Sequence, residues 1–289
     1  MVAPISSFFQ KRAMGIGCTV NKAISPRGSE EDGLIPGFMA YSRRLAARLR
    51  DEGRYDAAGK LDMYVRRFVA FLGKSELPLN DIDRQLIRNY CAWLEGRGLA
   101  RNSTSLYVRN LKRVYLQAVS EGLVADSHPF DGQDVSYRVK KERNGLSIDD
   151  IVRLRFLDLG RCNKSVCFAR DIFLFSVFAH GMAAKDIFSL THDNIRDGRL
   201  TYVSNITGRV VTITLTPLLK EIADNYARPD TSSLFPVVTS DNAKGQWRQH
   251  CTALHNINRN LKTIGRMLGL PYPLNMTVAR HTGKSMAKG

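Results

Sequence analysis

The feature that most restricts the fold of this chain is helical periodicity interrupted at short intervals by glycine and proline. Between residues 38 and 118, apolar residues recur three and four positions apart in four stretches of ordinary helix length. Glycine closes the second stretch at Gly73, the third at Gly96 and the fourth at Gly122. Because short amphipathic helices must bury their apolar faces against one another, the pattern predicts a small domain of four helices. Asn102 or Ser103 is the expected N-cap of the fourth.

The second half of the chain predicts more helices and one small β element. Ser147, followed by Asp149 and Asp150, has the composition of a helix start. Helices are expected at about 166–179, 184–190, 217–226, 241–268 and 277–289. Residues 199–203 and 210–215 are instead rich in β-branched side chains and flank Thr207-Gly208, which predicts a hairpin. We therefore expect a mainly α chain with a small β-hairpin or sheet.

These patterns divide the chain into four parts. A flexible N-terminal arm is expected at 1–36, where glycine and proline are frequent, and the helical domain at 37–127. A basic linker is expected at 128–146 and a second domain at 147–289. Within the linker, Lys140, Lys141 and Arg143 surround a single acid, Glu142. Either this stretch is a solvated connector, or it is a basic strap that lies on a phosphate backbone.

The charge balance favours a polyanionic partner. The chain has 43 Lys and Arg against 27 Asp and Glu, a formal net charge of +16. An excess of this size attracts nucleic acid, although it also serves solubility alone. Neither an apolar run of about 18 residues nor a signal peptide is found, so we expect a cytoplasmic protein without a membrane partner. Five scattered cysteines fit free thiols in a reducing compartment.

Two motifs that suggest other chemistry are rejected. Cys162 with Cys167, and Cys251 with His255, lack the spacing of paired zinc ligands, and Cys167 lies in an apolar helical pattern. Gly283-Lys284-Ser285 resembles the end of a phosphate-binding loop, but neither the earlier glycine nor a preceding strand is present. We therefore expect no metal, no cofactor and no small-molecule substrate.

Several short sequences resemble the tyrosine recombinase, or phage integrase, family in their order and spacing. Arg101-Asn102-Ser103-Thr104, with Tyr107, Arg109 and Leu111 to Tyr115 after it, resembles the last helix of the family's core-binding domain. His180-Gly181-Met182 and Asp186-Ile187 resemble its first catalytic segment, in the form seen in Bacteroidetes integrases. Gly198–Tyr202 with Thr207-Gly208 resembles its hairpin, and Arg280-His281-Thr282 its second arginine motif. The resemblance covers about residues 36–288.

The resemblance implies a fold and a reaction. The fold is a C-shaped clamp, in which a helical SAM-like core-binding domain and an α+β catalytic domain enclose double-stranded DNA. The reaction is transesterification through a 3′-phosphotyrosyl link, in DNA integration or recombination of a mobile element. Two arginines clamp the phosphate, a hairpin lysine protonates the leaving oxygen, and no metal takes part. Self-association on DNA and a location with the bacterial nucleoid are also implied.

The chain departs from the family pattern at several catalytic positions. Arg280 matches the second arginine, but the first is expected near Ala183, where His180 and Lys185 are the nearest basic residues. Asn205 and Ile206 stand where the hairpin lysine is expected. The nucleophilic tyrosine is expected beyond Gly289, so the chain is expected to be C-terminally incomplete. Whether it is an enzyme is therefore left open.

The expected DNA contacts are better supported by the sequence than the expected catalysis. On the resemblance and the charge pattern, Arg280 is the candidate catalytic residue. The candidate DNA-binding residues are Arg101, Arg109, Lys112, Arg113, Lys140, Lys141 and Arg143. Three functions remain: a recombinase that is complete only in a longer form, a catalytically inactive relative that binds DNA or regulates recombination, and an unrelated basic helical regulator.

Overall fold

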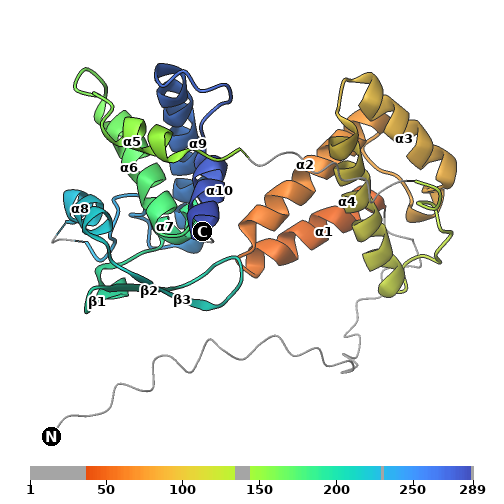
Figure 1. Ribbon diagram of the computed structural model, residues 1–289. Helices are drawn as coiled ribbons and strands as arrows, with labels where there is room; N and C mark the ends of the chain where they lie inside the picture. The colour runs from red at the N-terminus through yellow and green to blue at the C-terminus, as the bar shows by residue number, and fades with distance from the viewer. Residues whose placement is uncertain (1–36, 134–143, 229–230, 288–289) are drawn as a thin grey trace, which may run out of the picture.

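The computed structural model describes residues 37–133, 144–228 and 231–287. These residues form two bodies, each with its own hydrophobic core (Figure 1). The first core extends from Phe38 to Phe130 and the second from Leu146 to Ala279. The predicted arm at 1–36 lies outside the described residues, as do Lys140, Lys141 and Arg143. Among the described residues, no helix combines the length and apolar character needed to cross a bilayer.

The first body consists of four helices around an aromatic core. They are α1 (Phe38–Asp51), α2 (Tyr55–Leu72), α3 (Arg84–Gly96) and α4 (Arg101–Ser120), with a short 3-10 turn, η1 (Leu79–Asp81), before α3. The ring of Phe68 meets Phe38 edge-on at 5.5 Å and Tyr90 at 5.0 Å. Such edge-to-face pairs add about 0.5–1.5 kcal/mol each beyond the area that they bury. These rings therefore join α1, α2 and α3 in one core.

A carboxylate fixes the start of α1. Glu76 accepts hydrogen bonds from the backbone N–H groups of Met39 at 2.7 Å and Ala40 at 3.0 Å. The first N–H groups of a helix have no hydrogen-bond partner within the helix, and the positive end of the helix dipole, which lies there, favours an anion. Glu76 thus supplies the cap that Gly37, at the N-cap position, has no side chain to provide. The contact ties α1 to the segment that leads into η1.

The second body consists of six helices and a small sheet. The helices are α5 (Ile148–Arg155), α6 (Lys164–Phe178), α7 (Ala184–Phe188), α8 (Pro217–Tyr226), α9 (Ala243–Met267) and α10 (Met276–Met286). A 3-10 turn, η2 (His192–Asn194), precedes the sheet. Side-chain caps begin five of the helices: Ser147 for α5, Asn163 for α6, Thr216 for α8, Asn242 for α9 and Asn275 for α10. Each cap satisfies N–H groups that the helix leaves open.

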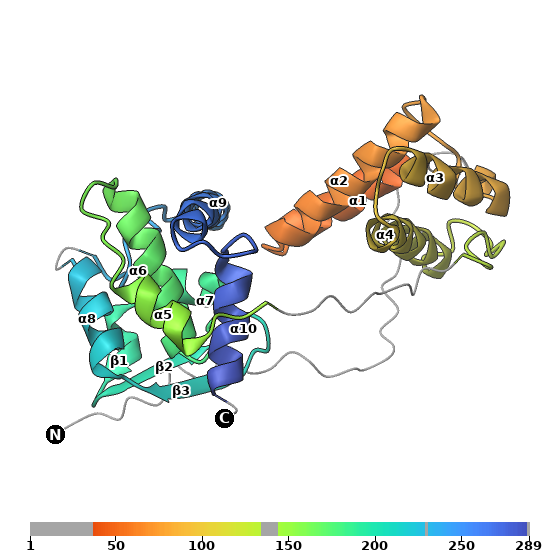
Figure 2. The ribbon, with the colours of Figure 1, turned by 45° about the horizontal axis from the view of Figure 1, so that its top comes forward.

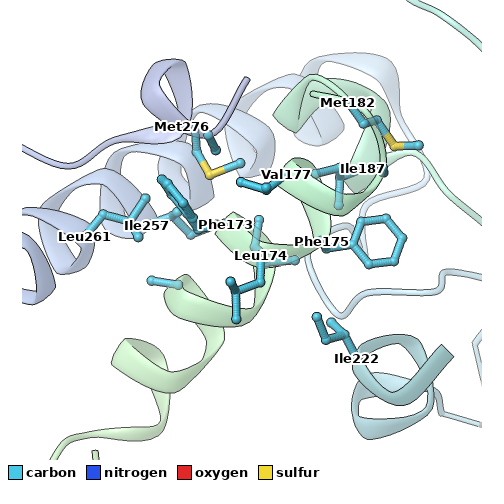
Figure 3. Packing of buried hydrophobic residues seen from close by; sticks show 14 of the residues in the cluster. Phe173, Leu174, Phe175, Val177, Met182, Ile187, Ile222, Ile257, Leu261 and Met276 are labelled. Carbon is cyan, nitrogen blue, oxygen red and sulfur yellow. The ribbon is translucent and has the colours of Figure 1, made fainter. Parts of the chain in front are cut away.

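The helix at the centre of the second body is α6, which packs against α5, α7, α8, α9 and α10. Seven consecutive positions, 171–177, are buried, so the helix has buried side chains on every face and is surrounded by protein. Figure 3 shows Phe173 directed toward Ile257 and Leu261 of α9, and Phe175 on the side of Ile222 of α8. The one carboxylate of α6, Asp171, is buried and accepts a hydrogen bond from the hydroxyl of Tyr226 at 2.7 Å.

The sheet is a three-stranded antiparallel meander in the order β1–β2–β3. Its strands are β1 (Ile195–Arg196), β2 (Arg199–Val203) and β3 (Val210–Thr214). Leu200 pairs with Ile213, and both side chains are buried in the second core. Because side chains alternate across a strand, this register places Val203 and Val210 on the exposed end of the hairpin.

The predicted fold class, mainly α with a small β-hairpin, is confirmed. One strand was missed, and one predicted detail is wrong. The strand β1 was not predicted, because two residues are too few to show an alternating pattern. Neither Asn102 nor Ser103 caps α4, which begins at Arg101 after Ala100. The Ala100 carbonyl already accepts the backbone N–H of Ser103 at 2.7 Å, so both predicted caps lie inside the first turn.

Candidate nucleic-acid interface

The candidate catalytic residue Arg280 lies in the second turn of α10, a helix fixed at several points. The Asn275 side chain accepts the backbone N–H of Thr277 at 2.9 Å and so begins the helix. Near its end, the buried Thr282 hydroxyl accepts the backbone N–H of Leu146 at 2.9 Å. The Arg280 side chain is half-buried, and its helix is held from both the preceding loop and the start of α5.

Two glycines let the backbone around Arg280 meet the turn that follows α6. A Cβ atom on Gly283 would lie 2.4 Å from the Gly181 nitrogen and 2.5 Å from the Val177 carbonyl oxygen. A Cβ atom on Gly181 would lie 2.5 Å from the Arg280 carbonyl oxygen, and its φ of +76° is a conformation that favours glycine. Backbone therefore contacts backbone here. This contact sets the position of Arg280 relative to α6.

Three polar groups lie together beside Arg280, on α7, β2 and the hairpin turn. Asp186 is buried and accepts hydrogen bonds from both the backbone and the side-chain nitrogen of Asn205, each at 2.8 Å. Burial, together with the Asp186 carboxylate, raises the pKa of the Tyr202 phenol, while the positive charge of Arg280 opposes that shift. The Tyr202 phenol therefore stays protonated at neutral pH. The Asp186–Asn205 bonds fix the hairpin turn against α7.

The residues at the other expected catalytic positions do not offer the expected chemistry. Ala183 precedes α7, and Ile206 is exposed in the hairpin turn. His180 is exposed, with a left-handed φ of 56°, on the turn that contacts α10. Lys185 is exposed and lines a cavity together with His250 of α9. Burial, followed by the positive charge of Lys185, lowers the pKa of His250, so this histidine is neutral at pH 7.

The four candidate DNA-binding residues on α4 are spread along the helix. From Arg101 to Arg113 the helix rises by about 18 Å and turns by about 120° beyond complete turns. Arg101 is exposed and lines a small pocket with Cys91 and Glu95 of α3. Arg113 is exposed and lines a larger groove of about 500 Å³ between α4 and the α1–α2 hairpin. Arg109 and Lys112 are half-buried. The four residues therefore do not form one pocket.

The two bodies meet at the end of the α1–α2 hairpin. The indole Nε1 of Trp247 on α9 donates to the Asp56 carboxylate at 2.7 Å. The Tyr55 ring stacks on the Trp247 ring with centroids 5.8 Å apart. A cavity of about 540 Å³ lies beside these contacts. Its lining comes from both bodies and includes Gly53–Ala57, Lys185, Ser189, Asn205, Gln246 and His250.

No sequence pattern indicates the Asp56–Trp247 contact, because the two residues are 191 positions apart and belong to no shared motif. In the sequence, Tyr202 is only one residue of the hairpin pattern, and nothing local marks it as a neighbour of Arg280. Within the described ranges, no group of three or more His, Cys, Asp or Glu side chains is arranged to hold a metal ion. The cations and N–H donors at these sites suit phosphate oxygens.

Comparison with known families identifies the first body. Residues 37–135 match the family model of the phage integrase SAM-like domain. This part of the chain is therefore similar to that domain. No curated protein matches the sequence closely enough to add a relative.

Solved structures extend the likeness to the second body. The λ integrase (residues 75–356) dimer bound to a COC′ core site is 17% identical, with a TM-score of 0.59 over 86% of this chain and 88% of that chain. The Tn1549 transposon integrase in complex with a circular intermediate DNA is 10% identical, with a TM-score of 0.60 over 86% and 85%. At these identities the likeness concerns the fold. The first body is thus similar in sequence to the phage integrase SAM-like domain, and most of the chain is similar in fold to these integrases.

Proposed function

We propose that this chain binds double-stranded DNA between its two domains and acts in DNA integration or recombination, with Arg280 on a backbone phosphate. The domain boundaries are part of this proposal: the helical domain ends at residue 127 and the second domain begins at residue 147. The observation that carries it is the placement of Arg280. A half-buried arginine, held by α10 against the turn after α6, is a rigid donor for a phosphodiester. The solved integrases of the same fold are bound to DNA, in one case as a tetramer on a Holliday junction. Self-association on DNA is proposed by the same analogy.

The proposed interface has two parts. The side chains of α4 and the basic residues 140, 141 and 143 contact phosphates and supply affinity without reading sequence. On the second domain, Arg280 contacts a phosphate. The net charge of +16 supports an electrostatic contribution to the binding of any duplex.

Replacing both Lys112 and Arg113 by alanine should weaken binding about equally on all duplex sequences. Each lost phosphate contact lowers the salt slope by about 1. Fluorescence anisotropy with several unrelated duplexes at fixed salt measures the effect. The matched control is Arg196→Ala with Lys220→Ala, which removes the same charge from exposed positions on β1 and α8, away from α4 (Figure 1). Equal losses in both double variants, or no loss in the first, would remove this end of α4 from the interface.

A second candidate function is binding without cleavage. The observation that favours it is the chemistry around Arg280, where Ala183 and Ile206 supply neither a cation nor an acid. The raised pKa of Tyr202 also disfavours that phenol as a nucleophile. This chain is then a relative that occupies DNA or limits an active recombinase.

Incubation of this chain with a pool of nicked suicide duplexes should give no covalent protein–DNA adduct. A tyrosine attack needs stabilisation of the phosphorane and protonation of the leaving oxygen, and the two expected side chains are replaced. Denaturing electrophoresis of labelled duplex measures adducts. An adduct that survives denaturation would contradict the non-cleaving function, and its loss in Tyr202→Phe would identify that phenol as the nucleophile.

A further inference from the structure

The most exposed apolar side chains of the second domain form a stripe along α5. Phe156 and Ile148 are the two most exposed large apolar residues in the described part of the chain, at 76% and 71%, and Val152 is 50% exposed. Residues four positions apart lie on one side of a helix, so these three side chains are aligned over about 12 Å. Single exposed apolar residues are ordinary on a protein surface, whereas an aligned apolar set indicates an interaction surface.

The stripe lies outside the hydrophobic core of the second domain. Ile151 and Leu154, on nearly the opposite side of α5, are buried and anchor the helix in that core. In Figure 2, α5 lies at the front of the second domain, between α8 and α10. On a helix face that meets only water, Glu and Lys are better helix formers than valine, isoleucine or phenylalanine. The stripe is therefore available to a partner.

The charges of α5 indicate what kind of partner fits the stripe. Asp149 and Asp150 lie in the first turn of the helix, and Arg153 and Arg155 lie in its last turn. Asp149 has no ion pair with any described residue, and the pair of Arg155 with Glu221 is 3.4 Å long and exposed, so solvent screens it. A second α5 that lies antiparallel to the first places its basic end beside the acidic end, at both ends of the pair. A parallel arrangement places like charges together instead.

We propose that the α5 stripe is a contact surface for a second copy of this chain, with the two α5 helices antiparallel about a two-fold axis near Val152. A two-fold contact uses the same surface on both copies. Ile148 of one copy then lies at the level of Phe156 of the other, and Asp149 lies at the level of Arg155. Three apolar side chains per copy bury far less than the roughly 800 Å² per partner of a stable complex, so the dimer forms reversibly and at high concentration. The inference goes beyond the proposed function, because the contact forms without DNA.

Charge reversal tests the antiparallel geometry. Asp149→Lys and Arg155→Glu should each weaken the dimer roughly tenfold, because each change occurs at both ends of the pair. In a mixed dimer of the two variants, each end again joins an acid and a base, so an equimolar mixture should associate about as well as the unchanged chain. Sedimentation velocity of the unchanged chain, of each variant and of the mixture, over a range of concentrations and without DNA, measures the dimer.

The controls separate this contact from folding and from DNA binding. Val152→Asp places two carboxylates at the axis and should weaken the dimer by roughly tenfold or more, since it also removes the central apolar contact. Val210→Asp makes the same change at another exposed valine, on β3, and should leave the dimer unchanged. Because both valines are exposed, circular dichroism should be the same for all of these chains.

Three results would overturn the α5 contact: an unchanged chain that stays monomeric at every concentration, a dimer that Val152→Asp does not weaken, or a mixture of the charge variants that associates no better than either variant alone. Duplex binding at low salt is measured separately and tests the proposed function. Its absence would overturn that function and leave the α5 contact standing.

Discussion

Gly283→Ala should destabilise the second domain by about 3 kcal/mol, because the added methyl group meets backbone that cannot yield. Its Cβ atom would lie 2.4 Å from the Gly181 nitrogen and 2.5 Å from the Val177 carbonyl oxygen. Relief requires α10 to move away from α6, and α10 carries Arg280. We therefore expect this one methyl group both to lower stability and to weaken DNA binding. Because the φ of Gly283 is not positive, the effect comes from the close contact and not from backbone strain.

Urea denaturation followed by Trp247 emission in a Trp93→Phe background measures the stability of the second domain, because Trp247 lies on α9. Gly96→Ala in α3 is the control for adding a methyl group without a clash, since a Cβ atom there would meet nothing within 4 Å and its φ is not positive; the stability of the first domain is then followed by Trp93 emission in a Trp247→Phe background. That substitution should change stability by less than about 1 kcal/mol, through helix propensity alone. If the urea midpoint of Gly283→Ala equals that of the unchanged chain, α6 and α10 do not meet as closely as described.

Much of the fold was predictable because local rules decide it. Ser147 and Pro217 mark helix starts by the hydrogen bonds and φ values that they supply, and the structure has α5 and α8 beginning there. The hairpin was predictable from the β-branched residues on either side of Thr207-Gly208. These features depend on residues within a few positions of one another.

The arrangement of the site was less predictable because it depends on distant residues. Arg280 is recognisable in the sequence as a motif residue, but the contact of its backbone with Gly181 joins segments about 100 positions apart. Glycine has no side chain, so the sequence does not show that Gly181 and Gly283 have a packing role. The Asp56–Trp247 contact spans 191 positions. Arg101 and Arg113 belong to one predicted helix, yet they line different pockets, because α3 packs near one and the α1–α2 hairpin near the other.

The second large effect concerns salt. The candidate phosphate contacts number eight: the seven basic residues on α4 and at positions 140–143, and Arg280. If most of them contact phosphates, DNA binding releases a comparable number of counterions. The affinity for duplex DNA should then fall by roughly 10³ to 10⁵ between about 50 and 200 mM salt, with a logarithmic slope of about −7. Arg280→Ala should make that slope shallower by about 1, whereas Arg280→Lys should keep the slope and weaken binding, because lysine lacks the bidentate fork.

The measurement that tests the central claim most directly is the affinity of the unchanged chain for a duplex at several salt concentrations. Anisotropy of a labelled duplex, titrated with protein across that range, gives the slope, and the Lys112→Ala, Arg113→Ala double variant tests whether α4 contributes to it. The account predicts tight binding at low salt and a steep linear loss on a logarithmic scale. Weak binding at every salt concentration, or an affinity that does not change with salt, would contradict the proposal that this protein binds DNA through contacts with its phosphates.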